Sequence, residues 1–210
     1  MENSQKGFVA PLLIVIIALL VIGGGMYVYN KKSGCSKNLP FAEYNYCLYK
    51  AAVQENNIEI CNTTSTNGTK YSCITNFAKE KEDLNACNGL PEFDNQVCIM
   101  GIAVKIKDLS LCKTLKSDDY RFSCETQIQK KSAIESGDEQ ACENIVGLSS
   151  KDLCYVGIAI KKGDAGICEK VVAQVYITSC YMQIAKNKND SQICNLIKSE
   201  PDKEYCFKEF

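Results

Sequence analysis

From residue 35 to the C-terminus, apolar residues recur at helical spacing around a series of cysteines. In LCYVGIAIKKGDAGIC (153–168), apolar residues stand one, four and five positions after Cys154, and SCYMQIAKNKNDSQIC (179–194) repeats this around Cys180. Such positions share one stripe of an α-helix. The fifth position is a small residue in five repeats, which lets a neighbouring helix come close: Ala52, Ala78, Ala103, Ala159 and Ala185. The pattern predicts packed helices and no strands.

The cysteines divide this region into seven repeats of about 26 residues. Their spacings alternate between about 12 and about 14 residues, with one deletion beside Gly89 and Pro91 and a four-residue insertion before Cys142. Four residues are about one helical turn, so the insertion keeps the apolar face in register. The cysteines are Cys35, Cys47, Cys61, Cys73, Cys87, Cys98, Cys112, Cys124, Cys142, Cys154, Cys168, Cys180, Cys194 and Cys206.

Polar residues that favour helix N-termini precede the cysteines. The first cysteine of repeats two to seven follows, by four residues, an Asn or Asp that is predicted to cap a short helix: Asn57, Asp83, Asp108, Asp138, Asp164 and Asp190. A second set is predicted to cap the other helix: Thr69, Asp94, Ser150 and Asp202. Each repeat is thus predicted to be an αα-hairpin with a two-turn helix, a turn of about four residues and a helix of about three turns.

The N-terminal region has a different pattern. Residues 8–22, FVAPLLIVIIALLVI, carry no charge, and the uncharged run continues to Asn30. A run of this length can cross the ~30 Å hydrocarbon layer as a helix, with Tyr27 and Tyr29 at one interface.

The fold class predicted is all-α, with an N-terminal transmembrane helix followed by a short α-solenoid of about seven disulfide-stapled hairpins. The domain boundaries predicted are a leader at 1–7, an anchor in the lipid bilayer at 8–30, a linker at 31–34 and the repeat domain at 35–210.

Three roles compete for the cysteines. A zinc site needs close pairs such as C-x2-C, and no two cysteines are nearer than 11 residues. A catalytic dithiol needs C-x-x-C or one exposed cysteine of low pKa. Disulfides are therefore predicted, which persist in oxidising compartments and place the repeats outside the cytoplasmic membrane, with the N-terminus inside.

Hairpin geometry favours one disulfide connectivity, although sequence alone leaves others open. In an antiparallel hairpin, two cysteines equally far from the connecting turn lie at the same height. Pairing across the 14-residue spacings would instead leave Cys35 and Cys206 single. The favoured pairs are 35–47, 61–73, 87–98, 112–124, 142–154, 168–180 and 194–206.

The composition argues against several classes of function. The chain of 210 residues has no histidine, which removes the commonest general base and metal ligand, and its net charge of -1 gives no indication of nucleic-acid binding. No phosphate loop, dinucleotide fingerprint or nucleophile elbow occurs, so we expect no enzyme, cofactor or metal. Glycosylation sequons begin at Asn62, Asn67 and Asn189.

Lys6, Gly7 and Phe8, directly before the apolar run, resemble the processing site of type IV prepilin-like proteins. The resemblance implies cleavage after Gly7, which would leave Phe8 first. Leu12 stands where bacterial pilins have Glu, and glycines at 23–25 interrupt the run. The remainder is similar to cysteine-paired helical repeats in surface proteins of uncultured archaea and small-genome bacteria.

The function predicted is a membrane-anchored, extracytoplasmic, non-catalytic binding or structural module at the cell surface. Its expected partner is a protein or a glycan, because stacked hairpins offer an extended recognition surface. The alternative is a pilin-like filament or accessory subunit processed after Gly7.

Overall fold

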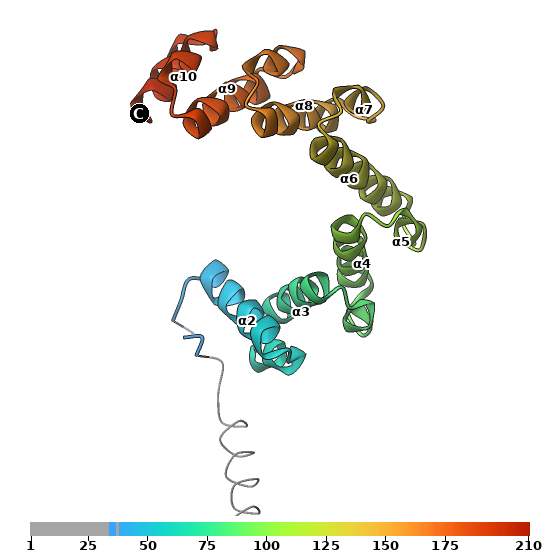
Figure 1. Ribbon diagram of the computed structural model, residues 1–210. Helices are drawn as coiled ribbons and strands as arrows, with labels where there is room; N and C mark the ends of the chain where they lie inside the picture. The colour runs from blue at the N-terminus through green and yellow to red at the C-terminus, as the bar shows by residue number, and fades with distance from the viewer. Residues whose placement is uncertain (1–33, 37) are drawn as a thin grey trace, which may run out of the picture. The chain divides into compact units, whose positions relative to one another are not determined.

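The computed structural model describes residues 34–36 and 38–210, and this part of the chain is all-helical, as predicted (Figure 1). The predicted anchor at 8–30 and the processing site at Gly7 and Phe8 lie outside the described residues. Among the residues that are described, no helix combines the length and the apolar character needed to span a membrane.

Repeats two to seven are each a hairpin of one short and one long helix, and the first repeat has a long helix alone among its described residues. The long helices are α2 (Phe41–Glu55), α3 (Asn67–Lys81), α4 (Glu92–Ile106), α6 (Asp118–Ser136), α8 (Leu148–Lys162), α9 (Gln174–Lys188) and α10 (Glu200–Lys208). The short elements are η1 (Ile58–Thr63), η2 (Leu84–Cys87), α5 (Leu109–Lys113), α7 (Glu139–Glu143), η3 (Ala165–Lys170) and η4 (Ser191–Leu196), where η marks a 3-10 helix.

Two details of the predicted hairpin differ from the structure. The short helices η2, α5 and α7 have four or five residues and are shorter than the predicted two turns, whereas the six-residue 3-10 helices η1, η3 and η4 make about two turns. The amide three residues after the cysteine bonds back to the cysteine carbonyl and closes the turn, as Val171 does to Cys168. The long helices begin earlier than predicted, so the second set of caps lies inside the first turn. Residues with no capping side-chain bond precede these helices, such as Pro91 and Gly147.

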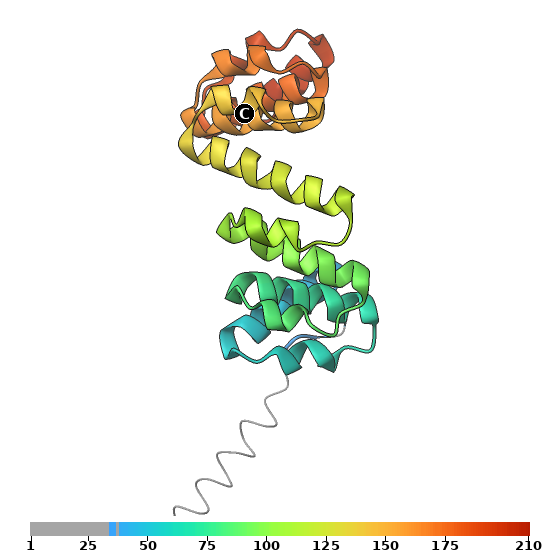
Figure 2. The same ribbon diagram turned by 90° about the vertical axis from the view of Figure 1, so that its right-hand side faces the viewer.

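The insertion before Cys142 lengthens a helix, as the sequence predicts. Helix α6 has 19 residues where the other complete long helices have 15, and Figure 2 shows it as an extended rod. Ala133 takes the place of the buried alanine of the other repeats, one turn further along. The added turn therefore leaves the small buried residue at the end of the helix.

Every described junction between repeats has the same backbone geometry. The residue after the long helix adopts positive φ, and the amide of the following Asn or Asp donates to the carbonyl of the buried alanine at 2.9–3.1 Å. This six-to-one bond satisfies a carbonyl that the helix end leaves without a partner. The positive-φ residues are Asn56, Glu82, Lys107, Gly137, Gly163 and Asn189.

The chain divides into two compact units, Met1–Phe77 and Ala78–Phe210, with the boundary inside α3. In the second unit, α4, α6, α8 and α9 pack successively side by side. The short helices α5, α7, η3 and η4 each pack against the long helices before and after them, and η2 packs against α4. Buried cysteines and aliphatic residues form its core, and Ile102, Ile158 and Ile184 are each at most 1% exposed. The second unit thus has the packing of a helical repeat.

Neighbouring repeats in the second unit are joined by buried polar side chains that sequence reasoning missed. Asp152, fully buried, accepts from the amides of Val172 and Ala173 at 3.0 and 2.8 Å, in the turn of the next hairpin. The side-chain oxygen of Gln96 likewise accepts a hydrogen bond from the amide of Ser117 at 3.0 Å. Both residues stand two positions before a cysteine of the long helix, and this spacing is the signal that could have identified them.

Lysines make a second connection between repeats. Lys105 donates to the carbonyl of Glu80 at 2.7 Å, Lys131 to those of Val104 and Lys105 at 3.1 and 2.8 Å, and Lys161 to that of Glu135. All three lysines stand seven residues after a cysteine. Each places a positive charge at the C-terminal end of the preceding long helix, where the helix dipole favours a cation.

Substitution by alanine at two glycines that share a repeat position should change the free energy of unfolding in opposite directions. A Cβ on Gly157 would lie 2.4 Å from Ile134 Cδ1, whereas on Gly101 its nearest neighbour is a lysine methylene at 3.7 Å. We expect Gly101→Ala to raise the free energy of unfolding by about 0.5–1 kcal/mol through helix propensity. Gly157→Ala should lower it by about 1–3 kcal/mol through overpacking between α6 and α8.

Denaturant unfolding with intact disulfides measures both effects. In an Ile134→Ala background the penalty of Gly157→Ala should disappear, because the clashing side chain is gone. Equal effects of alanine at the two glycines would contradict the close approach of α6 and α8.

Candidate functional site

The predicted site residues are distributed along the chain and do not converge on one centre. The fourteen cysteines form the seven pairs that hairpin geometry favours, with Cα–Cα separations of 5.5–5.9 Å and no free cysteine in the described part. Cys35 and Cys47, in the first hairpin, are partly exposed, whereas the other twelve are buried. The disulfides of hairpins two to seven therefore belong to the core.

The six predicted caps are structural. In each of them the side-chain oxygen accepts from the amide two residues ahead at 2.7–3.0 Å. The bond from the Ser110 hydroxyl, and then the bond from the Ser110 amide, lower the pKa of the Asp108 carboxyl. The sequon residues Asn62, Asn67 and Asn189 are all exposed, and their glycosylation stays a prediction.

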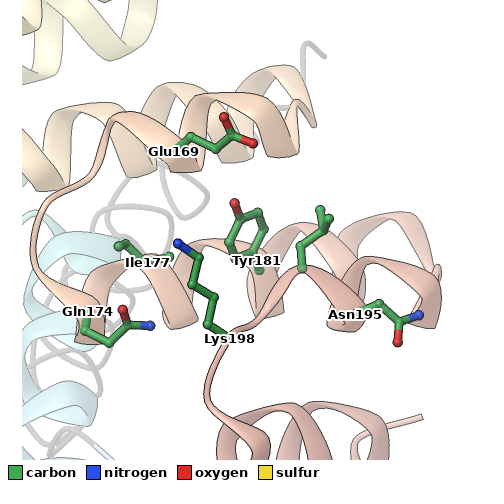
Figure 3. Close-up of a pocket in the computed structure, with 7 residues that line it drawn as sticks. Glu169, Gln174, Ile177, Tyr181, Asn195 and Lys198 are labelled. Carbon is green, nitrogen blue, oxygen red and sulfur yellow. The ribbon is translucent and has the colours of Figure 1, made fainter.

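A pocket lies in the second unit, on the sixth and seventh hairpins (Figure 3). Its volume is about 580 Å³, and residues from η3, α9, η4 and the turn after η4 surround it. We call it groove six, after the sixth hairpin. It is lined by Glu169, Gln174, Ile177, Tyr181, Asn195, Leu196 and Lys198.

The side chains of groove six are arranged around an apolar floor. Ile177 and Leu196 line the pocket with Tyr181, which is 5% exposed. The Tyr181 hydroxyl is directed toward the helix η3 that carries Glu169 (Figure 3). Gln174 and Asn195 stand at opposite ends. Burial raises the pKa of the Tyr181 hydroxyl, and the negative charge of Glu169 raises it further.

The equivalent positions one repeat earlier are occupied by side chains that contact one another. We call this cluster groove five and define it by Glu143, Lys151 and Tyr155 of the fifth hairpin and Lys170 of the sixth. The Tyr155 hydroxyl donates to Glu143, Lys151 Nζ lies 3.1 Å from Glu143 Oε2, and Lys170 Nζ lies 5.8 Å from the centre of the Tyr155 ring. Groove five is therefore closed by a charge network.

Groove six keeps the acceptor and the tyrosine of groove five but loses both lysines. At an offset of 26 residues, Glu169 and Tyr181 correspond to Glu143 and Tyr155, while Ile177 and Leu196 replace Lys151 and Lys170. Among the described residues, no ion pair reaches Glu169 and no hydrogen bond engages the Tyr181 hydroxyl. Lys198 extends across the pocket toward Ile177 instead (Figure 3).

Sequence reasoning did not find this site, because it looked for features that the repeats share. The signal lies in differences between repeats: Glu169 and Tyr181 are kept, both lysines are lost, and Lys198 stands where the preceding repeat has Val172. In the described part, no group of three Cys, Asp or Glu side chains is placed to bind a metal ion. Comparison with protein families, curated proteins and solved structures finds no match to this chain.

The buried Tyr155 hydroxyl of groove five should make the free energy of unfolding fall at alkaline pH. Burial, and then the bond to Glu143, raises the pKa of Tyr155 to about 12. An unfolded tyrosine ionises near pH ~10, so above that pH the unfolded state loses a proton that the folded state keeps, and stability falls. Between pH 10 and 12 the unchanged chain should lose about 2 kcal/mol more than Tyr155→Phe.

Denaturant unfolding at several pH values checks this difference. Tyr205→Phe is the control, because Tyr205 is 55% exposed, and it should retain the pH dependence of the unchanged chain. If the free energy of unfolding changed with pH equally in Tyr155→Phe and in the unchanged chain, the buried bond to Glu143 would be contradicted.

Proposed function

We propose that the chain is a non-catalytic binding or structural module at the cell surface, anchored in the cytoplasmic membrane by residues 8–30. Its repeats lie outside that membrane and bind a protein or glycan partner, without nucleic acid or cofactor. The single observation that carries the proposal is an open groove on a scaffold whose equivalent groove is filled by its own side chains.

The disulfides support the extracytoplasmic location. Seven pairs with no free cysteine in the described part need an oxidising compartment in which to form and persist. Closing a loop of about 12 residues contributes roughly 3 kcal/mol to each hairpin in the chain-entropy model. A reducing compartment would remove these contributions.

The grooves support a binding role. A concave site with an apolar floor and a few converging polar groups is the usual form of a ligand site. Groove six has this form, and its carboxylate and hydroxyl are not engaged within the described part of the chain. Because the disulfides brace the hairpins on both sides, little conformational entropy should be lost on binding.

The location is tested with the full-length chain expressed in a bacterium. Intact cells are treated with a membrane-impermeant protease. In a separate sample the chain is alkylated without reduction, and its mass is measured by mass spectrometry. We expect cleavage within the repeats, retention in the membrane fraction and no alkylated cysteine. Fourteen alkylated cysteines, or repeats protected in intact cells, would refute the location.

Binding is tested with the same chain in detergent micelles. It is screened against a glycan array and a displayed-peptide library, before and after reduction of the disulfides. We expect saturable binding that reduction abolishes, because the groove depends on the braced hairpins. Absence of a saturable ligand in both screens would count against a binding module.

A pilin-like subunit is the second candidate, and Lys6, Gly7 and Phe8 are the observation that favours it. N-terminal sequencing of the mature protein from its natural membrane separates the two functions. A mature chain that begins at Phe8 would support the pilin-like subunit. An intact N-terminus would exclude this candidate and leave an uncleaved anchor.

A further inference from the structure

Groove five indicates what kind of group belongs in groove six. In groove five, Lys151 supplies a positive charge to Glu143, and Lys170 supplies one above the Tyr155 ring. Groove six keeps the carboxylate of Glu169 and the ring of Tyr181 but has aliphatic side chains in place of both lysines. Lys198 stands where groove five has Val172, but it extends toward Ile177 (Figure 3) and makes no ion pair with Glu169 in the described part of the chain. What Glu169 lacks relative to Glu143 is thus a cation.

The replacements also define the shape of the missing group. Ile177 and Leu196 line the same pocket as Glu169, so a group that reaches the carboxylate passes over aliphatic carbon. Lysine and arginine combine a charged head with an apolar stem that packs on such surfaces. A compact ammonium ion or a metal ion would gain nothing from the apolar floor.

The ends of the groove favour a polypeptide as the carrier of that side chain. Gln174 and Asn195 stand at opposite ends (Figure 3), and side-chain amides both donate and accept, as peptide N–H and C=O groups require. A sugar would instead need an open aromatic face, and Tyr181 is only 5% exposed. Lys198 gives the groove a positive group as well, which disfavours a uniformly basic ligand.

We propose that groove six binds a lysine or arginine side chain of an extended peptide segment in a partner protein. The stem packs between Ile177 and Leu196, and the charged head binds the carboxylate of Glu169. The segment's backbone is held by Gln174 and Asn195. This inference rests on the proposed binding function and specifies its ligand.

The probe is a blocked, fluorescent nonapeptide rich in glycine and serine with one central lysine, measured by anisotropy against the full-length chain in micelles. Its matched control carries norleucine, which keeps the stem and removes the charge. We expect the lysine peptide to bind at least fivefold more tightly. The difference should shrink at high salt, because the head group is partly exposed to solvent.

Three variants locate the site. Glu169→Gln should lower the affinity for the lysine peptide about fivefold and leave the affinity for the norleucine peptide unchanged. Ile177→Lys with Leu196→Lys introduces the lysines of groove five and should abolish binding of both peptides. Glu143→Gln, in the closed groove, is the matched control and should have no effect on binding.

Far-ultraviolet circular dichroism of each variant verifies the helical fold. If the double lysine variant does not fold, Glu169→Gln still decides the outcome. Equal affinity for the lysine and norleucine peptides, or no effect of Glu169→Gln, would overturn the inference. A saturable glycan ligand in the screen above would also overturn it while leaving the binding function intact.

Discussion

Everything in this fold depends on the disulfide inside each hairpin, because one hairpin of about 26 residues has too few apolar side chains to hold two helices together. The short helices have only four to six residues, far below the length at which an isolated helix is stable. Each cross-link fixes the short helix at the height of its partner and reduces the entropy of the unfolded chain. The cysteine pairs also fill the centre of the core, where twelve of the fourteen cysteines are buried.

The second constraint is continuity from one repeat to the next. The buried alanine lies in the last turn of the long helix, and its carbonyl accepts a hydrogen bond from the amide of the following Asn or Asp. The side chain of that Asn or Asp then caps the next short helix. One local motif therefore ends one helix and starts another. In the second unit, Asp152 and lysines such as Lys161 add bonds to backbone groups of the neighbouring hairpin and so join the two hairpins.

A repeated backbone allows small substitutions to change the chemistry of one groove without changing the fold. Grooves five and six share a tyrosine and a glutamate at equivalent positions. They differ in the two lysines of groove five, which are Ile177 and Leu196 in groove six, and in Lys198, which replaces Val172. Where the lysines are present, the carboxylate and the hydroxyl are engaged within the protein. Where they are absent, the same positions line an open pocket beside an apolar floor. A repeat protein can in this way carry a binding site on one repeat and purely structural contacts on the next.

The sequence by itself determined the helical class, the seven repeats, the favoured cysteine pairs and the six Asn and Asp caps, because each depends on interactions within about 26 residues. Periodicity places the apolar stripe, and symmetry about one turn sets the height of two cysteines. The exact ends of the helices depended on local bonds, such as the one from Val171 to Cys168, that spacing does not encode. Only the tertiary structure decided which polar side chains cross between hairpins and which groove is open. Asp152, Lys161 and Glu169 are ordinary charged residues in the sequence, and their roles follow from what the neighbouring repeat places against them.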